Sequence, residues 1–158
     1  PAAAALHTHP DYSFSARFPD GKFAKYRSPG GGSPELREQL RILRDFLYGF
    51  DFVRMKPDDS VLVNVPKQMD ARALVEKGKA YAIYLHVKMP HNPKAGDYGD
   101  VIAGEILVRL PAGRYQAEWV NTKTGAVDKS ETFKHGGGNC KLKSPKFKVD
   151  VALRVRRA

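Results

Sequence analysis

The chain has 158 residues, of which 42% are hydrophobic and 28% charged, so it can bury a core of its own. This composition excludes a chain that is disordered throughout, and no apolar run approaches the roughly 20 residues that span a bilayer. The only cysteine, Cys140, excludes an intrachain disulfide and a cysteine-based metal cluster. We interpret it as a partly buried structural thiol.

The net charge of +10 is unevenly distributed along the chain. Nine Lys/Arg accompany eight Asp/Glu up to Asp59, whereas eighteen accompany nine from Ser60 onward. Such an excess of Lys and Arg most often indicates a solvated basic face, but a basic face can also attract polyanions. Near the end, seven cations accompany only Asp150: Lys141, Lys143, Lys146, Lys148, Arg154, Arg156 and Arg157. All of these except Arg157 are candidate ligand-binding residues.

The first elements precede residue 57. Residues 1–6 lack the basic and apolar stretches of a signal peptide. Residues 11–18 alternate aromatic or small residues with polar ones, which predicts an extended segment, and a Gly/Pro loop follows at 28–34.

A helix is predicted from Pro34 to about Gly49. Ser33 can cap it, Pro34 suits its first position, and Gly49 marks its end. An isolated helix of this length is marginal in water, so its apolar face needs a partner surface. That face has apolar residues spaced by four, three, four and three positions: Leu36, Leu40, Leu43, Leu47 and Phe50.

The rest of the chain has the pattern of short strands separated by turns. We expect strands at 60–65, 72–75, 79–88, 104–110, 113–120, 126–133 and 149–155. Gly125 is available for the left-handed position of the turn that begins at Asn121. The predicted fold is mainly β, an antiparallel β-sandwich of about seven to eight strands over 57–158. Residues 1–56 form the preceding segment, loop and amphipathic helix.

Several motifs resemble one known family. Residues 110–125 (LPAGRYQAEWVNTKTG) resemble the LPAG-Y-x-A-x-W-x-(D/N)-x-x-T-G pattern of a β-sandwich that carries a collagen-binding label. This domain follows the barrel in glycoside-hydrolase-like (β/α)8 proteins. Residues 81–85 (YAIYL) resemble its YALVYL strand, and 144–155 resemble its closing SP-F-x-x-D-x-A-L-x-(I/V) segment.

The resemblance extends to the first part of the chain. Residues 11–14, the Gly-Gly-Gly-Ser-Pro loop and residues 36–55 resemble the last strand, loop and helix of the barrel. A barrel needs about 250 residues, so the catalytic carboxylates would lie on strands outside this chain. The resemblance therefore implies no enzyme activity for the chain alone. It also implies a barrel as partner and an extracellular or cell-envelope location.

Catalytic and metal chemistry have little support in the residues themselves. Glycoside hydrolysis needs two carboxyl groups about 5 to 9.5 Å apart across a cleft. The acids Asp97 and Asp100 lie in a Gly/Pro loop, where acids commonly cap turns, and Glu105 and Glu118 lie on predicted strands. His7 and His9 could share a strand face but have no third and fourth ligand. We expect no cofactor and no metal.

Two aromatic residues are candidates for stacking on sugar rings. Trp119 is the only tryptophan, and we favour a core position for it over an exposed platform. Tyr98, in the loop at 89–100, is the more exposed candidate.

The leading hypothesis is a non-catalytic accessory module that supports a barrel or binds an extracellular glycan or matrix protein. The second is a self-assembling subunit that docks its helix on a neighbour. The third is a polyanion or nucleic-acid binder, for which no recognised nucleic-acid motif is present.

Overall fold

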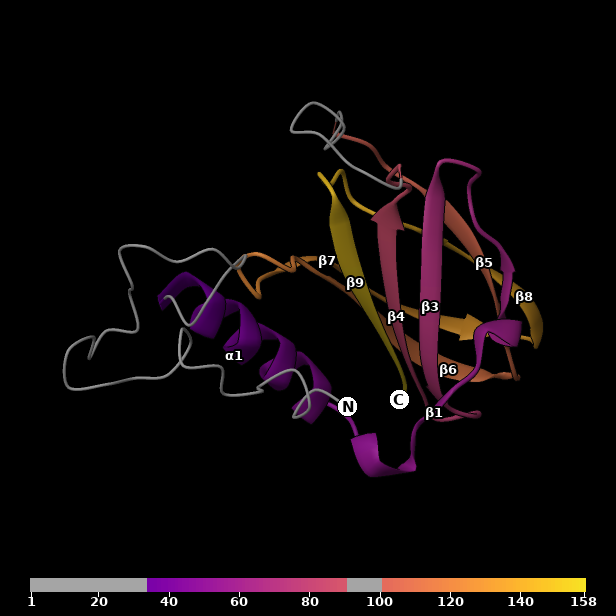
Figure 1. Ribbon diagram of the computed structural model, residues 1–158. Helices are drawn as coiled ribbons and strands as arrows, with labels where there is room; N and C mark the ends of the chain where they lie inside the picture. Colours follow the sequence, from indigo (N-terminus) through magenta and orange to yellow (C-terminus); the bar gives the residue numbers. More distant parts are fainter. Residues whose placement is uncertain (1–33, 91–100) are drawn as a thin grey trace.

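The computed structural model describes residues 34–90 and 101–158, which form one α-helix and nine strands (Figure 1). Two single 3₁₀ turns, η3 and η4, lie near the start of the sandwich. The elements are α1 (Pro34–Tyr48), η3 (Phe52–Arg54), β1 (Lys56–Pro57), η4 (Asp59–Val61), β2 (Leu62–Asn64), β3 (Met69–Glu76), β4 (Ala80–Val87), β5 (Glu105–Leu110), β6 (Gly113–Val120), β7 (Val127–His135), β8 (Gly138–Lys143) and β9 (Asp150–Arg157).

The strands form two antiparallel sheets, which confirms the predicted mainly-β sandwich. The large sheet has six strands in the order β1-β3-β4-β9-β6-β7, and the small sheet has three in the order β2-β5-β8. The strand β9 lies between β4 and β6, so it joins two parts of the large sheet that are far apart in sequence.

The core fills the space between the two sheets. Alternating residues of β3, β4, β6 and β9 face inward and meet Ile106, Val108 and Leu142 of the small sheet. The rings of Tyr81, Tyr115 and Trp119 are essentially inaccessible to solvent. Tyr115 donates its hydroxyl hydrogen bond to the Pro111 carbonyl at 3.0 Å, which compensates its burial.

The outer face of the large sheet carries a second, smaller cluster against α1. Ala80 and Ala82 of β4 are buried with Met55, and Phe46 and Phe50 pack against them. Alanine side chains leave room for the helix to approach the sheet closely. In Figure 1, α1 (indigo) lies beside the large sheet, on the side away from the small sheet.

Several predicted elements differ from the observed ones. No strand was predicted between 134 and 148, yet Gly138–Lys143 forms β8, in which Cys140 and Leu142 face the core. The basic residues between them obscured this alternation. The segment 60–65 was predicted as one strand, but it forms η4 and then the three-residue β2 with a register shift.

Other local predictions are confirmed. The helix α1 ends at Tyr48, just before Gly49. Gly125 adopts φ of +75°, the left-handed conformation expected of the turn. The predicted extended segment at 11–18 lies outside the described residues, and the division at residue 56 stays a prediction. Among residues 34–90 and 101–158, no helix has the length and apolar character needed to cross a membrane.

Candidate functional site

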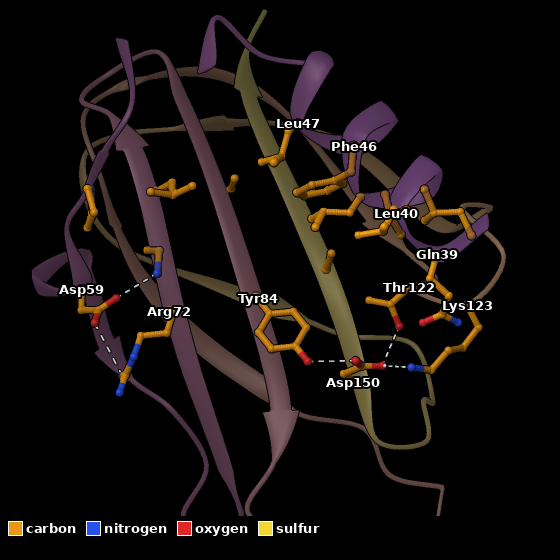
Figure 2. Close-up of a pocket in the computed structure, with 18 residues that line it drawn as sticks. Gln39, Leu40, Phe46, Leu47, Asp59, Arg72, Tyr84, Thr122, Lys123 and Asp150 are labelled. Atoms are coloured by element: carbon orange, nitrogen blue, oxygen red, sulfur yellow. Dashed lines mark hydrogen bonds and ion pairs between the residues drawn. The ribbon is translucent and has the colours of Figure 1, made fainter. Parts of the chain in front are cut away.

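A groove of about 660 Å³ runs between α1 and the outer face of the large sheet (Figure 2). Leu40, Leu43 and Leu47 of the helix form one wall, and the sheet forms the floor through Ala82 and Ala152. Polar side chains from β3, β4, β9 and the turn after β6 also line the groove. The groove is therefore apolar along its length, with polar groups at its margins.

The residues of the helix that contact the sheet and the turn after β6 overlap the predicted partner-docking face only at Phe50. Ile42 is buried, and its side chain meets the turn at Gly125. Phe46 and Phe50 stack edge to face at 5.5 Å and pack on the sheet. Leu43 is 46% exposed, so the predicted face lies beside the contact and lines the groove.

The C-terminal end of α1 is held by two arginines of β9. Arg156 donates a hydrogen bond to the Gly49 carbonyl at 3.5 Å. Its positive charge there is stabilised by the negative end of the helix dipole. Arg154 lies 6.0 Å from the centre of the Phe46 ring. Both pair with Glu118, at 2.8 and 3.0 Å. A β-carbon at Gly49 would lie 2.6 Å from Arg154 Nη1, so glycine permits this close approach.

Asp150 is the centre of the polar margin in Figure 2. It accepts hydrogen bonds from the hydroxyls of Tyr84 at 2.8 Å and Thr122 at 2.5 Å, and Lys123 Nζ lies 3.5 Å away. Burial raises the pKa of Tyr84 well above its ordinary range, and the hydrogen bond to the charged Asp150 raises it further. Asp150 therefore joins β4 and β9 to the turn that supports α1.

The residue before Asp150 has an unusual backbone. Val149 adopts φ of +72°, which costs free energy for a β-branched residue. The Asp150 N–H bonds to the Lys148 carbonyl at 3.0 Å, which makes a γ-turn, and the Val149 carbonyl accepts from Val87 N–H at 2.8 Å. This strained turn aims the Asp150 side chain at Tyr84 and Thr122.

A second carboxylate, Asp59, lies at the opposite margin of the groove in Figure 2. It accepts a hydrogen bond from the Ala73 N–H at 2.8 Å and pairs with Arg72 at 3.5 Å. Asp59 and Asp150 are thus both engaged by groups of the chain itself.

The other acids considered from the sequence lie elsewhere. Glu118 is bound to Arg154 and Arg156, and Glu105 pairs with Lys141 on the small sheet at 3.3 Å. Asp97 and Asp100 lie outside the described residues, as do His7 and His9. No group of three or more His, Cys, Asp or Glu residues suited to a metal occurs in the described part of the chain.

The structure does not bring the candidate ligand-binding residues together. Trp119 is fully buried between the sheets, so it packs in the core and offers no platform to a sugar ring. Tyr98 lies outside the described residues. Lys141 and Lys143 belong to the small sheet, Lys146 and Lys148 to the segment after it, and Arg154 and Arg156 to the large sheet.

Sequence reasoning missed Ile42, Tyr84 and Asp150 as groove residues. Ile42 and Phe46 are also spaced by one helical turn, so a second apolar face was visible in the sequence. The role of Asp150 had no local signal, because its partners Tyr84 and Thr122 are 66 and 28 residues away.

Comparison with known proteins finds similar chains only among solved structures. One is described as a glycoside hydrolase, with a TM-score of 0.55 and 18% identity over 84% of this chain and 30% of that chain. Another is a glycoside hydrolase family 5 protein from Bacteroides vulgatus ATCC 8482, with a TM-score of 0.53 and 16% identity over 78% of this chain and 24% of that one. No family model and no curated protein matches the chain.

These similarities concern the fold, and this chain spans less than a third of each neighbour. Residues 57–158 make up about 65% of the 158 residues, so a match over 84% includes residues ahead of the sandwich. The shared architecture is therefore more than the β-sandwich alone.

Proposed function

We propose that this chain acts as a non-catalytic accessory module in a glycoside-hydrolase-like protein, with the groove beside α1 seated against a barrel domain. The observation that carries the proposal is the apolar wall that Leu40, Leu43 and Leu47 of α1 present to the groove, with Leu43 exposed and the other two partly buried. An apolar surface of this kind commonly marks an interaction site.

The electrostatics of the groove support a docking role over a catalytic one. A glycosidase needs one carboxyl group that donates a proton and another that attacks or activates water. Asp59 and Asp150 each bind donors of this chain and connect its strands. These hydrogen bonds within the chain give both carboxylates a structural role that needs no substrate.

The neighbours provide further support. Both are glycoside hydrolases in which the matched region is a minor part of the chain. A module of this kind works beside another domain in the same polypeptide, and the match ahead of residue 57 is consistent with a barrel helix that stays attached to the sandwich.

Cysteine labelling tests the docking role. Cys140 is the only cysteine and is buried, and a Cys140→Ala background removes it so that one introduced thiol can be followed. The reporter is Leu43→Cys, and the control is Tyr48→Cys at an exposed position of the same helix. The rates of thiol modification are compared between this chain and the polypeptide encoded by the complete reading frame. We expect the Leu43→Cys rate to fall at least roughly tenfold in the longer polypeptide, while the Tyr48→Cys rate stays the same.

Three outcomes would contradict this proposal. They are a complete reading frame without a barrel, equal Leu43→Cys labelling in both polypeptides, and release of reducing sugars from β-glucan, xylan or mannan by this chain alone. If light scattering instead shows a dimer that Leu43→Ser dissociates and Tyr48→Ser does not, the groove serves self-assembly.

A further inference from the structure

A second polar surface lies on the outer face of the large sheet, where β7, β6 and β9 run side by side. Lys134 is directly opposite Arg114, and Thr132 is directly opposite Gln116. Gln116 is in turn opposite Arg156 on β9. Because directly opposite side chains are about 5 Å apart and diagonal ones about 7–8 Å, three cations surround Gln116. We call these five residues the basic grid.

The charge of the basic grid is only partly balanced by acids in the described part of the chain, because Glu118 pairs with Arg156 but not with Arg114 or Lys134. Glu118 is the neighbouring acid, and it already pairs with Arg154 and Arg156. In the described part of the chain, neither Arg114 nor Lys134 forms an ion pair. Like charges directly opposite each other on neighbouring strands destabilise a sheet. The fold therefore gains nothing from this pair, whereas an anionic ligand would neutralise it.

We propose that the basic grid binds an anionic polysaccharide, one that carries carboxylate or sulfate groups. Arg114 and Lys134 would bind the acidic groups through charge-assisted hydrogen bonds, and Arg156, which already pairs with Glu118 at 3.0 Å, would border the site. The polar side chains of Gln116 and Thr132 lie between them and are able to hydrogen-bond sugar hydroxyls. The surface lies on rigid strands and has exposed cations at 114 and 134, so it suits an extended, flexible polymer.

A polysaccharide fits this surface better than a nucleic acid. Single-stranded nucleic acids are held by stacking of bases on aromatic side chains along a basic groove. The outward positions of the basic grid and its neighbours in the next row, Ser130, Glu118 and Arg154, include no aromatic residue.

The basic grid differs from the cluster that the sequence suggested. Lys141 and Lys143 lie on the small sheet, and Lys141 is already paired with Glu105 at 3.3 Å. A double variant at these lysines removes the same number of charges as one at Arg114 and Lys134. The two double variants therefore separate an effect of position from an effect of net charge.

The experiment measures binding to heparin and to polygalacturonate over a series of NaCl concentrations. We expect Arg114→Ser/Lys134→Ser to weaken binding roughly tenfold at about 0.1 M salt and to lower the slope of log K against log salt by about 2. Lys141→Ser/Lys143→Ser should change affinity less than about threefold. Arg156 is left intact, because it also holds the end of α1.

Thermal unfolding checks that both double variants stay folded, as we expect from the exposed positions of the four residues. The proposal fails if wild-type protein binds neither polysaccharide, or if both double variants lose affinity equally. It also fails if duplex DNA binds more tightly than either polysaccharide and loses affinity in the same variant. This proposal does not depend on the docking of the groove, and its failure leaves that function untouched.

Discussion

Val149 is the only non-glycine residue with positive φ in the described part of the chain. A non-glycine residue at φ of +72° is held there by its surroundings, at a cost on the order of 1–3 kcal/mol. The hydrogen bonds of the γ-turn and of Val87 hold it in place. The strained turn brings Asp150 to the groove margin, where it meets Tyr84 and Thr122.

Replacement of Val149 by glycine removes this strain. We expect Val149→Gly to leave the free energy of unfolding unchanged or to raise it by up to about 1 kcal/mol, because glycine adopts positive φ without penalty. Val127→Gly, at a 45% exposed strand position, should instead lower it by about 1 kcal/mol. Urea unfolding of both variants measures the difference. An equal loss in both would show that Val149 is not strained.

At the scale of elements, α1 is the piece whose packing decides the groove. Phe46 packs on the sheet and Ile42 on the turn at Gly125, and both line the groove together with Leu40, Leu43 and Leu47. One apolar arc thus serves this contact and the groove, and only the contact side is covered within the described residues. The amphipathic helix was predicted correctly, and the assignment of its leucine face to a partner stays a prediction.

A pair of matched truncations on α1 tests which side of the helix is packed against the rest of the chain. Ile42→Ala should lower the free energy of unfolding by about 2–3 kcal/mol, since Ile42 is buried and meets the turn at Gly125. Leu43→Ala should cost less than about 1 kcal/mol, because its side chain is half exposed. Urea unfolding measures both costs, and hydrogen exchange of the α1 amides shows whether the helix detaches locally. A larger cost at Leu43 than at Ile42 would mean that the Leu43 side of the helix is the one packed against the rest of the chain.

For the whole molecule, burial of tyrosines contributes to the loss of stability at alkaline pH. Burial raises the pKa of Tyr81, Tyr84 and Tyr115 in the folded state. An unfolded tyrosine loses its proton near pH 10, so above that pH the unfolded chain binds fewer protons than the folded one. The stability that these groups contribute is therefore present at neutral pH and is lost as pH rises through about 10 and above.

The urea midpoint, measured from pH 8 to about pH 11, tests this dependence. We expect Tyr84→Phe to flatten the alkaline decline in part, since Tyr81 and Tyr115 still titrate. Its stability at neutral pH should also be lower, because Asp150 loses the hydroxyl that it accepts from. The slopes with pH are therefore compared instead of the absolute values. Parallel curves for the two proteins would exclude Tyr84 as a contributor.

How much the sequence predicts depends on how local the signal is. Alternation identified the strands around Tyr81 and Trp119, and the turn chemistry of Gly125 was read correctly. In β8 the strand was missed because its outward lysines dominated the pattern. The groove margin could not be predicted, since it depends on contacts of Asp150 across 66 and 28 residues.

The position of β9 has a consequence for the order of folding. The hairpins β3–β4 and β6–β7 pair residues close in sequence, so each can form early at a small cost in loop entropy. The two hairpins have no pairing with each other, and only β9 joins them. Closure of the large sheet thus requires a contact between β4 and β9 across most of the sandwich, and such long-range steps are slow. Until β9 arrives, the edges of β4 and β6 remain unpaired, and the nascent molecule is most vulnerable to aggregation at these edges.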